Sequence, residues 1–383
     1  MSAPHHRLSR VLMTADAVGG VWTYSLGLAA GLAQAGVAVE LAVMGPPPDD
    51  PQRRAAGAIP ALRLHESSLK LEWMEDAAGD VARAGDWLLE LEARTRPDLV
   101  HLNGYAHAVL PFRAPKLVVA HSCVRSWWRA VHGQDPPPVW DAYTRAVTAG
   151  LAAADHVVAP SGAMLAALVD GYGPLPSPAS VIPNGLPPAA HEQARKRDVV
   201  LAAGRIWDAA KNIATLVAVA DRLAWPVWIA GDRAPGEGRA AELPGVIALG
   251  RLDAAAMARA YADASIYALP ARYEPFGLSI LEAAQHGCAL VLGDIPSLRE
   301  NWEGAALFVD PADAGGLAGR LADLIADPAA RAAWGARART RAADFSLPRT
   351  CAAVLDLYTR LTGVRAAAVP APSTHKEISA CAS

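Results

Sequence analysis

Two carboxylates separated by seven residues, Glu274 and Glu282, are the side chains of this 383-residue chain best placed to do chemistry. The apolar stretch at 265–269 predicts a buried strand before Glu274, and a helix should begin near Gly277. Glu274 would therefore follow the carboxyl end of the strand, beside the unpaired amides of the first helical turn, which form an anion site. Glu282 would lie about one turn into that helix, within reach of a group bound there. The alternative for Glu282 is a solvated surface acid.

The string Glu-Pro-Phe-Gly-Leu-Ser-Ile-Leu-Glu that begins at Glu274 resembles the E-x7-E signature of the retaining glycosyltransferases of family 4, which have the GT-B fold. The resemblance implies that Glu274 contacts the hydroxyls of the transferred sugar and that Glu282 contacts the ribose of the nucleotide. It also implies that the amides of Phe276, Gly277 and Leu278 lie near the sugar and the phosphates. Such carboxylate–hydroxyl contacts are charge-assisted and orient a sugar firmly.

Two cations follow the predicted strand at 199–203, which opens the second half of the chain. The segment Gly204-Arg205-Ile-Trp-Asp-Ala-Ala-Lys211-Asn212 resembles the Gly-Arg…Lys-Asn loop of the same family. The resemblance implies that Arg205 and Lys211 neutralise the diphosphate leaving group as its bond to the sugar breaks. A pair of solvated surface cations is the alternative.

Two adjacent glycines, Gly19 and Gly20, lie between a predicted strand at 10–15 and a predicted helix at 22–35. Glycines at such a turn let backbone amides approach a phosphate closely. The segment resembles the glycine-rich loop of family 4, which lines the cleft opposite the donor. It does not match G-x-G-x-x-G, and the next carboxylate, Glu40, lies inside a strand rather than at its end. A nicotinamide-dependent enzyme is therefore disfavoured.

Two histidines follow predicted strand ends, His121 after the strand at 117–120 and His107 after the strand at 99–102. His121 resembles the first-domain histidine of family 4 that hydrogen-bonds the donor sugar. A structural histidine with satisfied hydrogen bonds is the alternative reading of the same position. His107 is a further candidate for the cleft.

Four side chains that could bind an acceptor follow His121 directly: Arg125, Trp127, Trp128 and Arg129. Indoles suit stacking on a sugar ring or packing against a lipid, and arginines suit an anionic acceptor. Packing of the two tryptophans in the core is an equal alternative.

The sequence predicts no metal site and no bound cofactor. It contains no Asp-x-Asp, no His-Glu-x-x-His and no Walker-type Gly-Lys-Ser/Thr. The four cysteines stand singly, which excludes a cysteine-based zinc site by spacing and argues against a disulfide framework. Arg205, Lys211 and a helix dipole would then replace the charge of a metal.

Size and composition predict a protein of two ordinary domains, because 383 residues are too many for a single core. The uncharged stretch at 17–39 is diluted by glycines and polar residues, so we expect no membrane-spanning helix, and the N-terminus lacks the pattern of a secretory signal. The net charge of −3 comes without a basic stripe, which disfavours nucleic acid as a partner. We expect a cytoplasmic protein that could associate peripherally with the inner face of the membrane.

Strand–helix alternation in both halves predicts an α/β protein with two Rossmann-like, doubly wound parallel-sheet domains that face a central cleft, the GT-B fold that the resemblance implies. Nearly continuous apolar runs suit parallel strands that are buried on both faces. The predicted parts are an acceptor-side domain at 1–180, a nucleotide-sugar donor domain at 181–347, a closing helix at 348–363 that packs back toward the first domain, and a disordered tail at 364–383.

The resemblance implies a retaining hexosyltransferase that moves a hexose from a nucleoside diphosphate sugar to a hydroxyl of a glycan, a lipid-linked sugar or a small molecule. A double displacement needs a carboxylate nucleophile, and the sequence identifies none in the first domain. The resemblance implies the family's same-face route instead, in which the departing phosphate helps to deprotonate the acceptor. Two alternatives stay open: a sugar-nucleotide epimerase of the same fold, and a non-catalytic nucleotide-sugar-binding subunit. The nucleobase, the acceptor and the oligomeric state also stay open.

Overall fold

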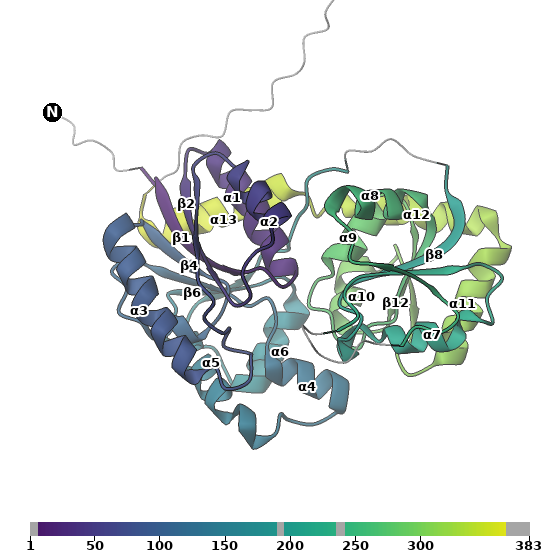
Figure 1. The fold of residues 1–383 in the computed structure, drawn as a ribbon, viewed down its shortest axis with the longest axis horizontal. Helices are drawn as coiled ribbons and strands as arrows, with labels where there is room; N and C mark the ends of the chain where they lie inside the picture. Colours follow the sequence, from purple (N-terminus) through teal and green to yellow (C-terminus); the bar gives the residue numbers. More distant parts are fainter. Residues whose placement is uncertain (1–6, 190–194, 235–241, 365–383) are drawn as a thin grey trace, which may run out of the picture.

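Two parallel sheets with interleaved helices form the structure, a computed structural model that describes residues 7–189, 195–234 and 242–364 (Figure 1). The first sheet has seven strands in the order β3-β2-β1-β4-β5-β6-β7, and the second has six in the order β10-β9-β8-β11-β12-β13. Within these described sheets every strand pair is parallel. The predicted fold of two doubly wound α/β units is confirmed.

The strands of the first sheet are β1 (Arg10–Asp16), β2 (Ala38–Met44), β3 (Leu62–Glu66), β4 (Leu99–Leu102), β5 (Lys116–Val119), β6 (His156–Ala159) and β7 (Ala179–Val181). The helices of this half are α1 (Gly20–Gln34), α2 (Asp50–Gly57), α3 (Ala78–Thr95), η1 (Ala106–Val109), α4 (Val124–His132), η2 (Pro138–Trp140), α5 (Asp141–Ala153) and α6 (Gly162–Tyr172).

The strands of the second sheet are β8 (Arg197–Ala203), β9 (Val227–Ala230), β10 (Ile247–Gly250), β11 (Ala264–Leu269), β12 (Ala289–Gly293) and β13 (Leu307–Val309). The helices of the second half of the chain are η3 (Ala209–Lys211), α7 (Ile213–Ala220), α8 (Ala254–Asp263), α9 (Leu278–Gln285), α10 (Pro296–Trp302), α11 (Ala314–Ala326), α12 (Pro328–Ala342) and α13 (Leu347–Thr362).

The strand order of each sheet reverses at one point, between β1 and β4 in the first sheet and between β8 and β11 in the second. At such a switch point the loops that follow the two central strands diverge, and a crevice opens outside their carboxyl ends. The chain after β1 contains the two glycines, and the chain after β11 contains Glu274. The fold therefore directs both predicted motifs to crevices of the kind that bind ligands.

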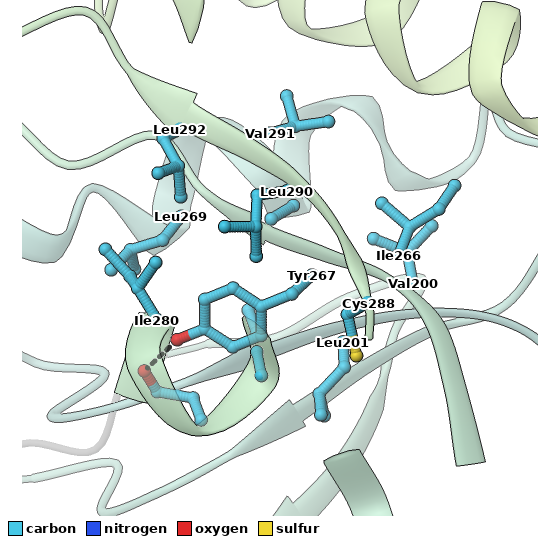
Figure 2. Close-up of a cluster of buried hydrophobic side chains, with 14 of the residues drawn as sticks. Val200, Leu201, Ile266, Tyr267, Leu269, Ile280, Cys288, Leu290, Val291 and Leu292 are labelled. Atoms are coloured by element: carbon cyan, nitrogen blue, oxygen red, sulfur yellow. Dashed lines mark hydrogen bonds between the residues drawn. The ribbon is translucent and has the colours of Figure 1, made fainter. Parts of the chain in front are cut away.

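The core of the second sheet fixes the helix that contains Glu282. Every residue of β11 and β12 is buried, as their continuous apolar sequences predict. Figure 2 shows the ring of Tyr267 among the apolar side chains of this core. Its hydroxyl bonds with Ser279 Oγ at 2.8 Å and with the carbonyl oxygen of Ala203 at 3.1 Å. Tyr267 thus ties the first turn of α9 to the ends of β8 and β11.

Helix α13 returns from the second half of the chain to the first sheet, where it lies beside α1 (Figure 1). The contact is close, because a Cβ atom added at Gly31 of α1 would come within 2.2 Å of Cys351 Sγ. The hydroxyl of Tyr358 bonds with His101 Nδ1 of β4 at 2.6 Å.

The first sheet ends at Val181 and the second begins at Arg197. The functional division into an acceptor-side and a donor domain stays a prediction. The predicted tail lies outside the described residues, except for Val364. Across the described ranges, no helix combines the length and the apolar character needed to span a membrane.

Candidate active site

A cavity of about 420 Å³ lies between the two sheets and is lined by residues of both halves of the chain. The predicted site residues that line it are Gly19, Gly20, His121, Trp127, Arg205, Lys211, Glu274, Phe276, Gly277, Leu278 and Glu282. The charged residues in its wall come from the second half of the chain, namely Arg205, Asp208, Lys211, Asp232, Arg251, Glu274 and Glu282. The fold has therefore brought most of the predicted site together around one space large enough for a ligand.

Glu274 and Lys211 form an ion pair in the wall of this cavity. Their side chains are 11% and 16% exposed, so water screens the pair much less than it would a surface pair. Ser297 Oγ donates to the carbonyl oxygen of Glu274 at 2.7 Å and helps to fix the backbone there. The carboxylate and the ammonium are thus held side by side after β11, where one could contact hydroxyls and the other phosphate oxygens.

The turn into α9 requires a glycine at position 277. Gly277 has a φ of 93°, in the left-handed region, and an added Cβ atom would lie 2.6 Å from Ile280 Cδ1. Helix α9 begins at the next residue, and its first two amides, which precede those of Ile280 and Leu281 that donate to the carbonyl oxygen of Gly277, lack partners within the helix. These amides and the positive end of the helix dipole lie in the same wall as Lys211. The turn is therefore suited to binding an anion.

Glu282 lies on α9 in the same wall, and the hydroxyl of Tyr261 donates to its Oε2 atom at 2.9 Å. Burial raises the pKa of this carboxyl to about 7, and the bond from Tyr261 offsets only part of that effect. A carboxylate held in a partly dry wall has a strong tendency to take a further hydroxyl donor from a ligand.

Arg205 is aligned by a buried acid, Asp208. Their closest atoms, Nη2 and Oδ2, are 2.9 Å apart, and Asp208 Oδ1 accepts a hydrogen bond from Trp127 Nε1 of the first half at 3.0 Å. Burial acts to raise the pKa of Asp208, but Arg205, the indole N–H and other donors outweigh it and lower the pKa. Gly19 is a close neighbour, since a Cβ atom there would be 3.8 Å from Arg205 Nη1. The glycine loop therefore lies next to the guanidinium in the cavity wall.

His121 follows β5 and is half-buried in the wall from the first half of the chain. Its Nε2 atom lies 2.8 Å from Asn103 Oδ1, and its ring meets Tyr24 edge to face at 4.6 Å. Burial lowers the pKa of His121 to about 3, so the imidazole is neutral at ordinary pH.

Two family models match the chain: Glycosyltransferase Family 4 over residues 18–190, and Glycosyl transferases group 1 over residues 197–327. The first match contains six of the seven strands of the first sheet, all but β1, and the second contains all six strands of the second sheet. The chain belongs to glycosyltransferase family 4.

Two curated proteins resemble parts of this chain. D-inositol 3-phosphate glycosyltransferase of Kineococcus radiotolerans is 30% identical over 257 residues, which are 56% of this chain and 59% of that protein. Phosphatidyl-myo-inositol mannosyltransferase of Mycolicibacterium smegmatis is 30% identical over 209 residues, which are 49% of this chain and 54% of that protein. The chain thus matches little more than half the length of these relatives.

Solved GT-B structures resemble nearly the whole chain. Sucrose-phosphate synthase from Thermosynechococcus elongatus has a TM-score of 0.79 at 22% identity, over 93% of this chain and 99% of that one. Anabaena Alr3699/HepE, solved in complex with UDP-glucose, has a TM-score of 0.72 at 18% identity, over 92% of this chain and 100% of that one. At these identities the similarity shows the fold.

Two arginines predicted for the acceptor site lie outside the cavity of this family 4 protein. Arg125 Nη2 and Arg129 Nε each lie 2.5 Å from a carboxylate oxygen of Asp135, and Arg129 also pairs with Asp170 at 2.6 Å. These acids satisfy both guanidinium groups at the surface of α4. The structure gives the arginines acidic partners and does not bring them to the cavity, and their role in acceptor binding stays a prediction.

Trp128 and His107 also lie outside the cavity lining. Trp128 packs against His132 on α4, with 4.4 Å between the ring centroids. His107 is buried in η1, where its Nε2 atom lies 3.1 Å from the carbonyl oxygen of Val81. Of the two predicted tryptophans, Trp127 is therefore the one that reaches the cavity.

Sequence reasoning missed Tyr273, the residue directly before Glu274. Its hydroxyl lies 2.7 Å from Ser126 Oγ and 3.2 Å from Ser122 Oγ, and its ring packs against the core of the first half. The loop that contains Glu274 is thereby fastened to the opposite domain. The signal available in the sequence was an aromatic residue inside the motif, but its partners lie about 150 positions earlier.

Two further contacts across the cleft were missed. The carboxylate of Glu300 accepts hydrogen bonds from the backbone N–H groups of Gly162 and Ala163 at 2.7 and 2.8 Å, in the first turn of α6. Arg251 pairs with Asp49 at 2.9 Å beside the cavity. The two halves of the chain are therefore held together on more than one side of the site.

Proposed function

We propose that this chain is a retaining glycosyltransferase that moves a hexose from a nucleoside diphosphate sugar to an acceptor hydroxyl without a metal ion. The observation that supports this most is the gathering of Glu274, Lys211, Arg205 and Glu282 in one cavity at the start of α9. A donor of this kind presents ribose hydroxyls, a diphosphate and sugar hydroxyls in a row. The cavity wall contains acids that could accept from the hydroxyls and cations that could bind the diphosphate.

The two carboxylates would bind the two sugars of the donor. In the proposed complex Glu282, held by Tyr261, accepts hydrogen bonds from the ribose. Glu274 accepts hydrogen bonds from the transferred hexose. Because Glu274 is already paired with Lys211, its charge is compensated in the half-buried wall.

The cations and the turn into α9 would bind the diphosphate. Arg205 and Lys211 would neutralise the negative charge that grows on the leaving phosphate, and the amides of Gly277 and Leu278 would add hydrogen bonds. Four or more donors fixed before the reaction begins stabilise a departing phosphate without reorganisation. Among the described residues no group of three His, Cys, Asp or Glu side chains is arranged to hold a metal ion. Independence of a metal is part of the proposal and needs its own test with a chelator.

The acceptor would enter from the side of the first domain, where Thr23, His121, Ser122 and Trp127 line the cavity. In the same-face route, the departing phosphate takes the proton of the acceptor hydroxyl as the new bond forms, and the configuration at the anomeric carbon is retained. Closure of the two domains would exclude water and so limit hydrolysis of the donor.

UDP-glucose is the first donor to test, because Anabaena Alr3699/HepE of the same fold was solved with UDP-glucose. The names of the two inositol-related relatives make a glycan, a lipid-linked sugar or a small polyol suitable acceptors to screen. A lipid-linked acceptor would require peripheral association with a membrane.

A thermal-shift screen of UDP-, GDP- and ADP-sugars tests the proposed donor site. A ligand at 100 times its Kd stabilises the folded state by about 2.7 kcal/mol, which is a readily measured shift. We expect one nucleotide series to raise the Tm of the wild type and of Glu90→Ala, an exposed control on α3, with and without EDTA. The shift should be lost in Glu282→Ala. A shift that survives in Glu282→Ala would show that the nucleotide binds elsewhere.

A further inference from the structure

A row of hydrogen bonds runs from α13 through the first domain to the cavity. The hydroxyl of Tyr358 bonds with His101 Nδ1 at 2.6 Å, and His101 Nε2 lies 3.1 Å from Asn103 Oδ1. The same oxygen lies 2.8 Å from Nε2 of His121, the histidine in the cavity wall. His101 and Tyr358 are fully buried, so water does not replace these bonds.

The orientation of the Asn103 amide is fixed by its other contacts. The Nδ2 atom lies 2.7 Å from the carbonyl oxygen of Thr14, which can only accept, and 3.1 Å from Ser25 Oγ. The backbone N–H of Asn103 donates to Thr14 Oγ1 at 2.9 Å. The amide nitrogen must therefore face Thr14, and the amide oxygen must face the two imidazoles.

This orientation determines which nitrogen of each histidine carries the hydrogen. Because Asn103 Oδ1 can only accept, His101 and His121 must each donate from Nε2. Burial lowers the pKa of His101 to about 4 and that of His121 to about 3, so each neutral ring has a single N–H group. His101 Nδ1 accepts from Tyr358. His121 Nδ1 is left with a lone pair, and no hydrogen bond to it occurs within the described ranges of the chain.

We propose that Asn103 is a positioning residue that holds His121 as the Nε2–H tautomer, so that His121 Nδ1 accepts a hydrogen bond from a hydroxyl of the bound substrate. The identity of that hydroxyl rests on the proposed function, but the tautomer does not. An imidazole fixed in this way cannot donate to a phosphate or carboxylate oxygen from Nδ1. His121 therefore selects a hydroxyl at this place in the cavity and rejects an anion.

Nitrogen NMR of protein labelled with ¹⁵N in the histidine rings tests the tautomer directly. We expect the His121 signals, identified by their loss in His121→Phe, to show a protonated Nε2 and an unprotonated Nδ1 between pH 6 and 8. Ser25→Ala removes one contact of Asn103 Nδ2 but leaves Oδ1 in place, so it should keep the wild-type pattern. An Nδ1–H tautomer in the wild type, or a mixture of both tautomers, would overturn the proposal.

The positioning role is tested by Asn103→Ala, which removes the acceptor. The variant should show a mixture of His121 tautomers and a roughly tenfold lower kcat/KM for transfer, a loss in the range of one hydrogen bond. If the wild type transfers sugar and Asn103→Ala has the same kcat/KM, the proposed role of Asn103 is wrong. If the wild type transfers no sugar, the proposed function fails, and the wild-type NMR pattern still decides the tautomer. The NMR result on the wild type also decides it if Asn103→Ala does not fold.

Discussion

Replacing Glu282 by glutamine should make the folded protein more stable above neutral pH, although it removes a proposed ligand contact. Burial in the wall of α9 raises the pKa of this carboxyl from 4.5 to about 7. Between these two values the unfolded chain releases its proton before the folded chain does, so the stability of the wild type falls as pH rises. Glutamine keeps an oxygen for the hydroxyl of Tyr261 but has no proton to lose.

The size of the effect follows from the two pKa values. A tenfold change in proton affinity is worth about 1.4 kcal/mol, so the difference between 4.5 and about 7 corresponds to about 3 kcal/mol. Below pH 4.5 the carboxyl is protonated in both the folded and the unfolded state, so its burial costs the wild type no stability through ionisation. Above pH 7 it is ionised in both states, and the loss of stability has reached its full size. The free energy of unfolding of Glu282→Gln should therefore exceed that of the wild type by an amount that grows from near zero at pH 4.5 to about 3 kcal/mol at pH 8.

Urea denaturation followed by circular dichroism, at several pH values from 5 to 8.5, measures this difference. Glu90→Gln is the matched control, because Glu90 is an exposed acid on α3 and should give no difference that depends on pH. If Glu282→Gln and the wild type have the same free energy of unfolding at pH 8, the carboxyl is not held in a poorly solvated wall. The assignment of Glu282 to the cavity would then fail with it.

Three other variants test contacts around the site. Lys211→Met should lower kcat by two to three orders of magnitude, because the leaving phosphate loses a fixed cation. Steady-state rates measure this effect, and a decrease in kcat of less than tenfold would contradict it. Tyr273→Phe keeps the ring but loses the hydroxyl that reaches the first domain, so kcat should fall roughly threefold to tenfold while donor affinity in calorimetry stays the same. Glu300→Ala removes the carboxylate that accepts hydrogen bonds from the first turn of α6. Small-angle scattering should show a more open chain, and the free energy of unfolding should fall by about 1 kcal/mol. An unchanged scattering curve would show that Glu300 does not hold the cleft closed.

Much of the fold could be predicted because its central strands are buried on both faces. Strands β2 and β12 are apolar along their length, so neither has a polar face that would indicate exposure to solvent. The exception is Glu40 in β2, whose carboxylate pairs with His65 at 2.7 Å. Strand β3 was missed, since Leu-Arg-Leu-His-Glu alternates and lies at an edge of its sheet. Helix α4 was missed because its two indoles and two arginines read more easily as a binding loop.

The second-half part of the site could be predicted because its residues lie close together in sequence. Glu274 and Glu282 are joined by one turn and one helix, so local structure alone places both at the carboxyl end of β11. The sequence predicts Arg125 and Arg129 for acceptor binding, and in the structure Asp135, a few residues further on, pairs with both outside the cavity. The sequence showed the charges and did not show which of them the fold would bring together.

The contacts missed most completely join residues far apart in the chain. Trp127 reaches Asp208, and Asn103 gathers Thr14, Ser25 and His121 around one amide. None of these pairings has a local pattern, because each depends on how two loops from different strands approach one another. Hydrogen bonds of this kind follow from the tertiary structure and could not be read from residue spacing.

Proton NMR of the reaction with UDP-glucose or the best donor from the thermal-shift screen, recorded in the first minutes and with EDTA present, tests the central claim most directly. We expect the anomeric signal of the transferred hexose to appear with the same configuration as in the donor, and we expect no such signal with a Glu274→Gln, Glu282→Gln double variant. A product of the opposite configuration would contradict retention. A donor that binds in the cavity but is only isomerised, or is left intact with every acceptor tried, would contradict glycosyl transfer itself.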